Sequence, residues 1–194
     1  MSDPPSDPSP RSPAKAGLSR ETLLPLLASH VLKHGLGGAS LRPLAKAAGT
    51  SDRMLIYHFG NKEQLIIDLL EYIAGIYAAA LEAALGSERA ATRQECLARI
   101  LAEGRTPAMQ SFLVLWWEIV AGSARGLPGY REAAEQMMTK QLAWLETQMP
   151  ADDPDPAAGA RYLMTLLEGT LMLGAVGHAR TAREGLLASG LSDA

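Results

Sequence analysis

The sequence predicts an all-α protein, and three observations support this fold class. From Leu18 onward, apolar residues recur at helical spacing. Ser, Thr, Asp or Asn precedes several of these repeats and Gly or Pro follows them, as is typical of helix ends. No segment alternates apolar and polar residues over a β-branched run, as a half-buried strand would.

Length and composition narrow the class of protein. The chain has 194 residues, 47% of them hydrophobic, which suffices for a core without disulfides. Its one cysteine, Cys96, excludes an internal disulfide and a cysteine-only zinc site. Glu118 and Glu168 interrupt the two longest apolar runs, which fall short of the roughly 18 residues of a membrane span. With no apolar signal core at the N-terminus, we expect a soluble, cytoplasmic protein.

Charge is distributed unequally along the chain. Residues 1–63 carry a net charge of +3 and residues 64–194 a net charge of −6. A basic front part suits a polyanionic partner, although an asymmetry of this size also arises by chance. The first 16 residues hold five Pro and four Ser and are expected to form a disordered tail. Arg11 and Lys15 of this tail either lie along a phosphate backbone or are simply solvated.

Two helices are expected before Gly49. Thr22 is the expected N-cap of the first helix, which places Pro25 in the first turn, where no N–H partner is lost. The Gly-rich segment 35–38 ends this helix. Ser40 then caps a short helix that ends at Gly49.

Two further helices follow this turn. Thr50 or Ser51 caps a short helix over residues 52–59, which ends at the next glycine. Asn61 and Gln64 resemble a capping box for a long helix that reaches about Leu85.

The second half of the chain continues with helices. Thr92 and Glu95 predict a capping box for a helix ending near Gly104. The segment 109–122 is apolar nearly all round, so we expect a helix buried on most sides. A long amphipathic helix is expected over residues 130–149.

An acidic, Pro-rich connection precedes the last two helices. Asp155 is the expected N-cap and Pro156 the first residue of a helix running to about Val176. Thr181 and Glu184 are expected to cap the final helix.

The short helices on either side of Gly49 form a helix-turn-helix arrangement. The expected exposed residues of the second helix suit a DNA groove. Arg53 can reach a guanine edge or a phosphate, Met54 can contact a thymine methyl group, and Tyr57 and His58 can bond phosphates. The same arrangement occurs as a packing corner in all-α proteins, so spacing alone leaves both interpretations open.

Two sequence segments carry a resemblance to a known family. Residues 41–51 read Leu-Arg-Pro-Leu-Ala-Lys-Ala-Ala-Gly-Thr-Ser, and residues 55–63 read Leu-Ile-Tyr-His-Phe-Gly-Asn-Lys-Glu. Over residues 18–70 the chain closely resembles the DNA-binding domain of the tetracycline-repressor (TetR) family of transcriptional regulators. Ile56 departs from the family, which usually has Tyr there, and this removes one typical backbone-contacting hydroxyl.

The resemblance implies an all-helical homodimer with two functional parts. Three N-terminal helices would bind operator DNA, and a larger helical domain would bind a small effector and dimerise. We therefore expect a tail at 1–16, a DNA-binding domain at 17–63 and a ligand-binding and dimerisation domain at 64–194. The residues expected to contact DNA are Ser40, Arg42, Thr50, Ser51, Arg53, Met54, Tyr57, His58 and Lys62.

Signals for other chemistry are weak. His30 and His34 are four residues apart and resemble half a metal site, but Val31 stands where a zinc protease needs Glu, and no third ligand is obvious. The Gly-rich segment 35–38 follows a helix, so it is not a nucleotide fingerprint. Cys96 is expected to be a small core residue. We expect no catalytic residues, no metal and no cofactor.

Trp and Met gather on three helices of the larger domain. Core packing explains most of them, and the family resemblance adds an apolar effector cavity as the alternative. Glu118 lies within an apolar helix, and is either a satisfied structural group, a surface residue or a ligand contact. The residues expected to bind the effector are Trp116, Trp117, Glu118, Met138, Trp144 and Met164.

The last two helices carry small residues among many leucines, with little chain left to cover them. A twofold dimer is the economical way to bury such a stripe. The expected interface residues are Leu163, Leu167, Gly169, Leu171 and Gly174.

Together these features predict a ligand-responsive, DNA-binding transcriptional repressor that a small hydrophobic effector releases from its operator. Its expected partners are double-stranded operator DNA, the effector and a second copy of the chain, and it is not an enzyme. The alternative is an all-helical small-molecule-binding or catalytic protein whose front domain is only a packing unit. The basic, exposed face of residues 52–62 and the lack of a catalytic constellation favour the regulator.

Overall fold

The computed structural model describes residues 18–190, and in this range it contains helices and connecting loops with no strand, which confirms the all-α prediction. The tail residues Arg11 and Lys15 lie outside the described residues. The elements in chain order are α1 (Arg20–His34), the short 3-10 helix η1 (Leu36–Gly38), α2 (Leu41–Ala47), α3 (Asp52–Phe59), α4 (Lys62–Leu85), α5 (Arg93–Glu103), α6 (Pro107–Ala124), α7 (Tyr130–Thr147), α8 (Pro156–Ala175) and α9 (Ala179–Ala188).

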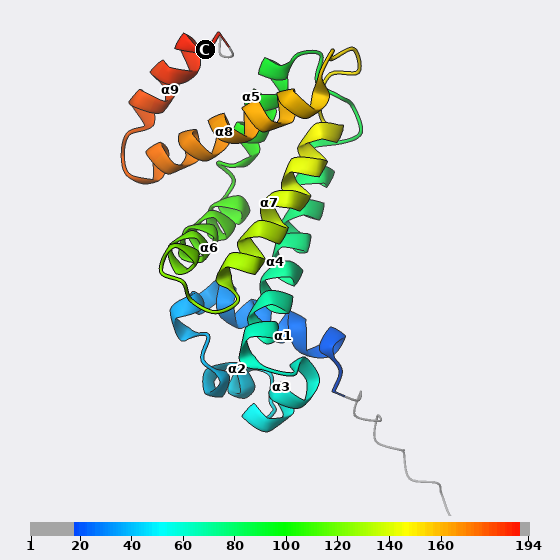
Figure 1. The fold of residues 1–194 in the computed structure, drawn as a ribbon, viewed down its shortest axis with the longest axis vertical. Coiled ribbons are helices and arrows are strands. Elements are labelled where there is room, and N and C mark those ends of the chain that lie inside the picture. Colours follow the sequence, from blue (N-terminus) through cyan, green and yellow to red (C-terminus); the bar gives the residue numbers. More distant parts are fainter. Residues whose placement is uncertain (1–17, 191–194) are drawn as a thin grey trace, which may run out of the picture.

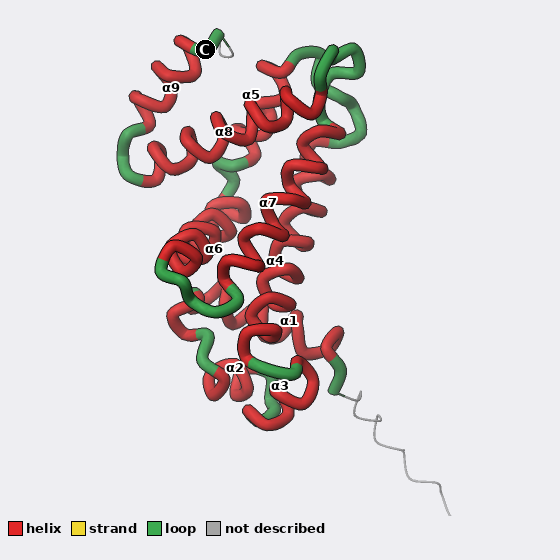
Figure 2. Tube along the Cα trace, in the orientation of Figure 1, coloured by secondary structure: helices red, strands yellow, loops and turns green. Residues whose placement is uncertain are grey.

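The helices form an elongated assembly (Figure 1). The helices α1, α2 and α3 gather at one end, while α5, α8 and α9 lie at the other. The long helices α4 and α7 run side by side between the two ends, and α6 packs against α7 and also contacts α1 and η1. Figure 2 shows that loops only connect these helices. One helix, α4, therefore extends from the N-terminal end deep into the rest of the molecule.

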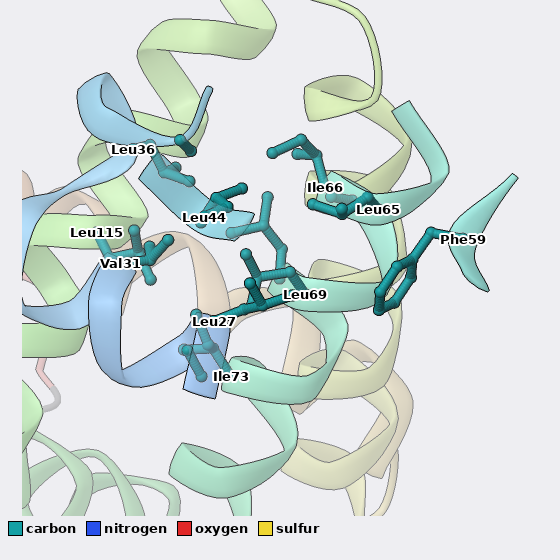
Figure 3. Close-up of a cluster of buried hydrophobic side chains, with 14 of the residues drawn as sticks. Leu27, Val31, Leu36, Leu44, Phe59, Leu65, Ile66, Leu69, Ile73 and Leu115 are labelled. Atoms are coloured by element: carbon teal, nitrogen blue, oxygen red, sulfur yellow. The ribbon is translucent and has the colours of Figure 1, made fainter. Parts of the chain in front are cut away.

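A first hydrophobic core holds the N-terminal helices together (Figure 3). Leu27 of α1, Leu44 of α2, Phe59 of α3 and Leu69 of α4 are each at most 1% exposed and belong to one cluster. Leu115 of α6 belongs to the same cluster, so the core continues across the expected domain boundary after residue 63. The helix α4 is consequently part of both regions.

A second core lies at the opposite end. Leu97 of α5, Leu145 of α7, Leu163 of α8 and Leu186 of α9 are buried together in it. The connection between α7 and α8 is fixed on α5 by an ion pair, in which Arg93 donates to both carboxylate oxygens of Asp153 at 2.7 and 2.6 Å. This hydrogen bonding lowers the pKa of Asp153.

The first helix starts earlier than expected. Ser19 is the N-cap and forms a capping box with Thr22, which occupies the third helical position. The prediction of Thr22 as N-cap is therefore wrong, and Pro25 lies inside the helix. Pro25 is exposed, and it costs the helix one backbone hydrogen bond because it has no N–H.

Most of the other predicted caps are confirmed. The side chains of Ser51, Asn61, Thr92 and Asp155 each accept a hydrogen bond from the backbone N–H three residues later. Ser40 is the N-cap of α2 but makes no side-chain capping bond. The prediction for the final helix is wrong, because α9 begins after His178 and Thr181 lies inside it.

Two helices differ from the sequence expectations, α6 in its burial and α4 in its apolar length. Leu115, Trp116 and Ile119 of α6 are buried, but Val114 is 62% exposed, so the prediction that this helix is buried on most sides is wrong. The helix α4 is long and apolar enough, by length and composition, to cross a membrane, which corrects the expectation that no segment reaches that limit. Its N-terminal half is packed into the first core, and Leu69 is fully buried there.

Candidate functional site

The turn between α2 and α3 fixes the angle of a short, exposed helix. Gly49 has φ 63°, a conformation that favours glycine. The N–H of Thr50 donates to the carbonyl of Ala45 at 2.9 Å, which closes the turn. Leu55 and Phe59 anchor one face of α3 in the first core, so the opposite face is directed to solvent.

The exposed face of α3 carries part of the predicted DNA-contacting set. Asp52, Arg53 and Tyr57 are exposed, Tyr57 to 77%, and Met54 is half-buried. The residues of this set outside α3 are also at the surface: Ser40, Arg42, Ser51 and Lys62 are exposed, and Thr50 is half-buried. These residues all belong to α2, the turn, α3 and the start of α4, at one end of the molecule (Figure 1).

His58 is less available than the sequence suggests. It is half-buried, and its Nε2 is buried without a hydrogen-bond partner among the described residues. The expectation of an exposed imidazole is therefore wrong, because the end of α3 turns this side chain toward the protein. The carbonyl of His58 instead accepts a hydrogen bond from Arg20 Nε at 2.6 Å.

Arg20 holds the end of α3 in place, a role that sequence reasoning missed. Its Nη1 forms an ion pair with Asp68 of α4 at 2.8 Å, and its guanidinium lies 5.3 Å from the centre of the Phe59 ring. Arg20 thus ties α1, α3 and α4 together. No local pattern signals this role, since its partners are 38 to 48 residues away in the chain.

A cavity of about 200 Å³ lies between α4, α5, α6, α7 and α8. Of the residues expected to bind an effector, Trp116 and Trp144 line it. Tyr77 and Phe112 form a further aromatic pair in its wall with ring centres 4.6 Å apart. Of the other residues expected to bind an effector, none lines the cavity: Trp117, Glu118, Met138 and Met164. Trp117 and Met138 pack against the first core and Met164 against the second.

Glu168 lines the cavity but was not among the residues expected to bind an effector. It lines the cavity from α8, and its Oε2 accepts a hydrogen bond from Trp116 Nε1 at 3.0 Å. Burial raises the pKa of Glu168, and the bond from Trp116 opposes this shift. Glu168 interrupts an apolar run in the sequence, as Glu118 does, and this feature could have marked it as a candidate effector contact.

Glu118 instead joins two parts of the chain. Its Oε2 accepts a hydrogen bond from the backbone N–H of Leu36 at 2.5 Å. Gly35 lies directly beneath it, with φ 73°, and a Cβ at this position would stand 2.7 Å from Glu118 Oε1. Of the three roles left open for Glu118, the structure therefore supports the satisfied structural group.

The expected dimer residues are only partly at the surface. Leu163 and Leu167 are buried in the second core of the protomer, so they cannot form an interface directly, and Leu171 lines the cavity. Their burial arises because α5, α7 and α9 cover that face of α8. Gly169 and Gly174 have open space beside them. The exposed apolar residues of α8, α9 and the loop between them are Tyr162, Met172, Val176 and Leu187.

Comparison with known proteins identifies the N-terminal helices. A family model described as "Bacterial regulatory proteins, tetR family" matches residues 29–69, from within α1 into α4. The chain is also 34% identical over 59 residues to the HTH-type transcriptional repressor NicS of Pseudomonas putida, a match that spans 30% of this chain and 28% of NicS. Over these residues the chain resembles the TetR family of regulatory proteins.

Solved structures resemble the fold of this chain over most of its length. A Rhodococcus sp. chain assigned to the TetR family superposes with a TM-score of 0.65 at 21% identity, covering 88% of this chain and 95% of that one. Salmonella enterica GusR superposes with a TM-score of 0.57 at 22% identity, covering 89% and 90%. At these identities the likeness shows the fold alone.

The described residues offer little for metal or cysteine chemistry. No group of three or more His, Cys, Asp or Glu residues between positions 18 and 190 could hold a metal ion. His30 and His34 lie in contact, with ring centres 4.6 Å apart and ring planes tilted by 42°. Cys96 is buried in the second core, as expected, and burial raises its pKa to about 11.

Proposed function

We propose that this chain is a homodimeric transcriptional repressor of the TetR family, which binds operator DNA and releases it when a small molecule occupies the cavity. Residues 17–63 bind DNA, and residues 64–194 hold the effector and the dimer interface. The protein acts in the cytoplasm and catalyses no reaction. The similar protein NicS is itself a repressor, which favours repression over activation here.

One observation carries the DNA-binding part of the proposal. The helix α3 presents Arg53 and Tyr57 to solvent while Leu55 and Phe59 fix it to the core. A short, rigidly held helix with a guanidinium and a phenol on its free face suits the major groove, where Arg reads guanine and Tyr bonds phosphate. Lys62 at the first position of α4 adds a phosphate contact beside free backbone N–H groups.

Two connections support the release of DNA by an effector. Only Gly60 and Asn61 separate α3 from α4, and farther along α4 lines the cavity through Tyr77 and Leu81. The loop between α6 and α7 also touches the start of α4, because a Cβ at Gly129 would lie 3.0 Å from the carbonyl of Glu63. A ligand that moves α4 or α6 would therefore shift α3 and alter the spacing of the two recognition helices in a dimer.

The surface of α8 and α9 is the proposed dimer interface. Met172 is 48% exposed, Val176 after α8 is 63% exposed and Leu187 of α9 is 46% exposed. Small residues beside them, Gly169 and Gly174, leave room for close approach of a second copy. These exposed residues replace Leu163 and Leu167 in the proposal.

Selection of DNA duplexes from a random library tests the function directly. The wild-type chain should enrich a palindromic sequence with half-sites about one helical turn, ~34–36 Å, apart. Arg53→Ala should weaken binding to that sequence by about 1–3 kcal/mol and relax its sequence preference. Arg89→Ala, an exposed arginine in the connection between α4 and α5, serves as the matched control and should bind as the wild type does.

The alternative predicts a different result. If the front helices only pack, no duplex is enriched and Arg53→Ala changes nothing in a gel-shift measurement. That outcome would leave an all-helical small-molecule-binding or catalytic protein without a DNA function.

A further inference from the structure

We propose that the cavity takes a lipophilic organic cation, such as an aromatic ammonium compound, and that the Glu168 carboxylate recognises its charge. This inference rests on the proposed function in that it treats the cavity as the effector site. It goes further by naming the chemical class of the effector and the residue that selects it.

The Glu168 carboxylate has only part of its hydrogen-bonding capacity satisfied. Its Oε2 accepts the N–H of Trp116 at 3.0 Å. Among the described residues, no other hydrogen bond and no ion pair reaches this carboxylate, although its side chain is half-buried in the cavity wall. A carboxylate removed from water is costly unless a cation or further donors compensate it. A cationic ligand supplies that compensation.

The second step is the charge balance of the lining. Three carboxylates, those of Glu71, Glu82 and Glu168, line the cavity, against one ammonium group, that of Lys140. Lys140 is already engaged in an ion pair with Glu71. Both partners of that pair are largely exposed, so it stands at the solvent side of the site. The wall therefore retains an excess of negative charge, which favours a cation and opposes an anion.

The third step is the aromatic character of the wall. Tyr77, Phe112, Trp116 and Trp144 all line the cavity, and a cation is attracted to the faces of such rings. Trp116 brings an aromatic ring and the carboxylate close together, because it lines the cavity and donates its N–H to Glu168. Aliphatic residues such as Leu81, Ile100 and Leu113 complete the wall and suit an apolar body on the ligand. A volume of about 200 Å³ suits a small compound.

Binding of three probes to the full wild-type chain tests the ligand class without any variant. Phenyltrimethylammonium and tert-butylbenzene have nearly the same shape and differ in charge, and benzenesulfonate supplies the anion. The cation should bind about tenfold or more tightly than its neutral counterpart, measured by tryptophan fluorescence or calorimetry. Equal or tighter binding of tert-butylbenzene or benzenesulfonate, or no binding of the cation, would overturn the proposal.

A charge-removing variant tests the role of Glu168. Glu168→Gln keeps an oxygen that can accept from Trp116 and removes only the charge, so cation binding should fall about tenfold or more while tert-butylbenzene binding changes less than about twofold. Glu146→Gln, on an exposed site of α7 outside the cavity, makes the same chemical change and should leave both unchanged. If Glu168→Gln does not fold, Glu168→Asp retains the charge and should keep the preference for the cation. Loss of both probes together in a folded Glu168→Gln protein would assign Glu168 a structural role and overturn its part in recognition.

Failure of this inference is separable from failure of the proposed function. DNA selection and gel shifts need no ligand, so they report on the repressor function alone. Enriched operator DNA with no preference for the cation refutes the ligand class only. A clear preference for the cation in a chain that binds no DNA refutes the repressor function and leaves the ligand class standing.

Discussion

The Glu118 carboxylate accepts a hydrogen bond from the backbone N–H of Leu36 at 2.5 Å, and this contact joins the cavity-lining helix α6 to the segment that leads into α2. On the same helix, Phe112 and Trp116 line the cavity. A movement of α6 would therefore act on η1 through this hydrogen bond, in addition to the path through α4.

Removal of this acceptor should destabilise the protein. Glu118→Ala leaves the Leu36 N–H partly buried without a partner, at a cost of about 1–3 kcal/mol in the free energy of unfolding. Glu118→Gln retains an oxygen that can accept the bond, so its loss should be smaller. Urea denaturation measures both, with Glu146→Ala on the exposed face of α7 as control. Equal stability of Glu118→Ala and the wild type would show that the contact contributes nothing.

Gly35 provides an independent check on the same joint. Gly35→Ala places a Cβ about 2.7 Å from Glu118 Oε1 and also strains the backbone at φ 73°. In the Glu118→Ala background the clash disappears and only the backbone strain remains. A double-mutant cycle should therefore give a coupling of about 0.5–3 kcal/mol, with the second substitution costing less than it does in the wild type. Strict additivity of the two costs would mean that the side chain of Glu118 simply moves aside.

Local rules predicted the order of the helices well. Ser51, Asn61 and Asp155 are correctly predicted N-caps because the capping bond involves residues only three positions apart. Thr22 and Thr181 also have the side chain of a cap, but their helices begin upstream, after Ser19, which forms a capping box, and after His178, which makes no side-chain capping bond. Sequence pattern marks candidate caps, and packing of the whole helix chooses among them.

The surface proposed to face DNA was more predictable than the cavity. Arg53 and Tyr57 lie on the free face of a helix whose other face is fixed by Leu55 and Phe59, and this follows from helical periodicity. By contrast, Trp116 lines the cavity and its neighbour Trp117 does not. Which side chain meets a void depends on how several helices pack together, and one sequence does not contain that information.

Lys62 should contribute to DNA affinity without contributing to sequence preference. It is exposed at the start of α4, beside the exposed face of α3, where a phosphate contact carries no base information. Lys62→Ala should weaken binding to the selected operator and to unrelated duplexes by the same factor, and should reduce the slope of log affinity against log salt by about 1 per site. Gel shifts over a range of salt concentrations measure both quantities. A loss confined to the selected sequence would contradict this role and indicate a base contact.

The dimer should depend on exposed residues of the C-terminal region. Met172→Glu and Val176→Glu place charge on side chains that are 48% and 63% exposed in one protomer, and each removes about 1.5–3 kcal/mol of apolar burial if a second copy covers it. Light scattering should show monomers at micromolar concentration for the double variant. Leu26→Glu, at a residue of α1 that is 47% exposed, should remain a dimer. A double variant that stays dimeric with wild-type affinity would place the interface elsewhere.

The carboxyl group of Glu168 should make stability depend on pH. Burial raises its pKa in the folded protein above the ordinary glutamate value of 4.5, so the native state binds a proton more readily than the unfolded chain. Stability contributed by the protonated form is therefore present below the unfolded pKa and is lost as pH rises through the folded pKa. Above the folded pKa, the wild type bears the full cost of a buried charge. Glu168→Gln carries no charge at any pH, so without ligand it should be more stable than the wild type. Near pH 4 and below, the advantage of Glu168→Gln should shrink toward zero.

Thermal melts of both proteins across this range, in the absence of any ligand, measure the difference. An advantage that stays constant with pH would show that Glu168 does not titrate in this window, and a wild type more stable than the variant at neutral pH would show that Trp116 and the surrounding dipoles fully compensate the charge.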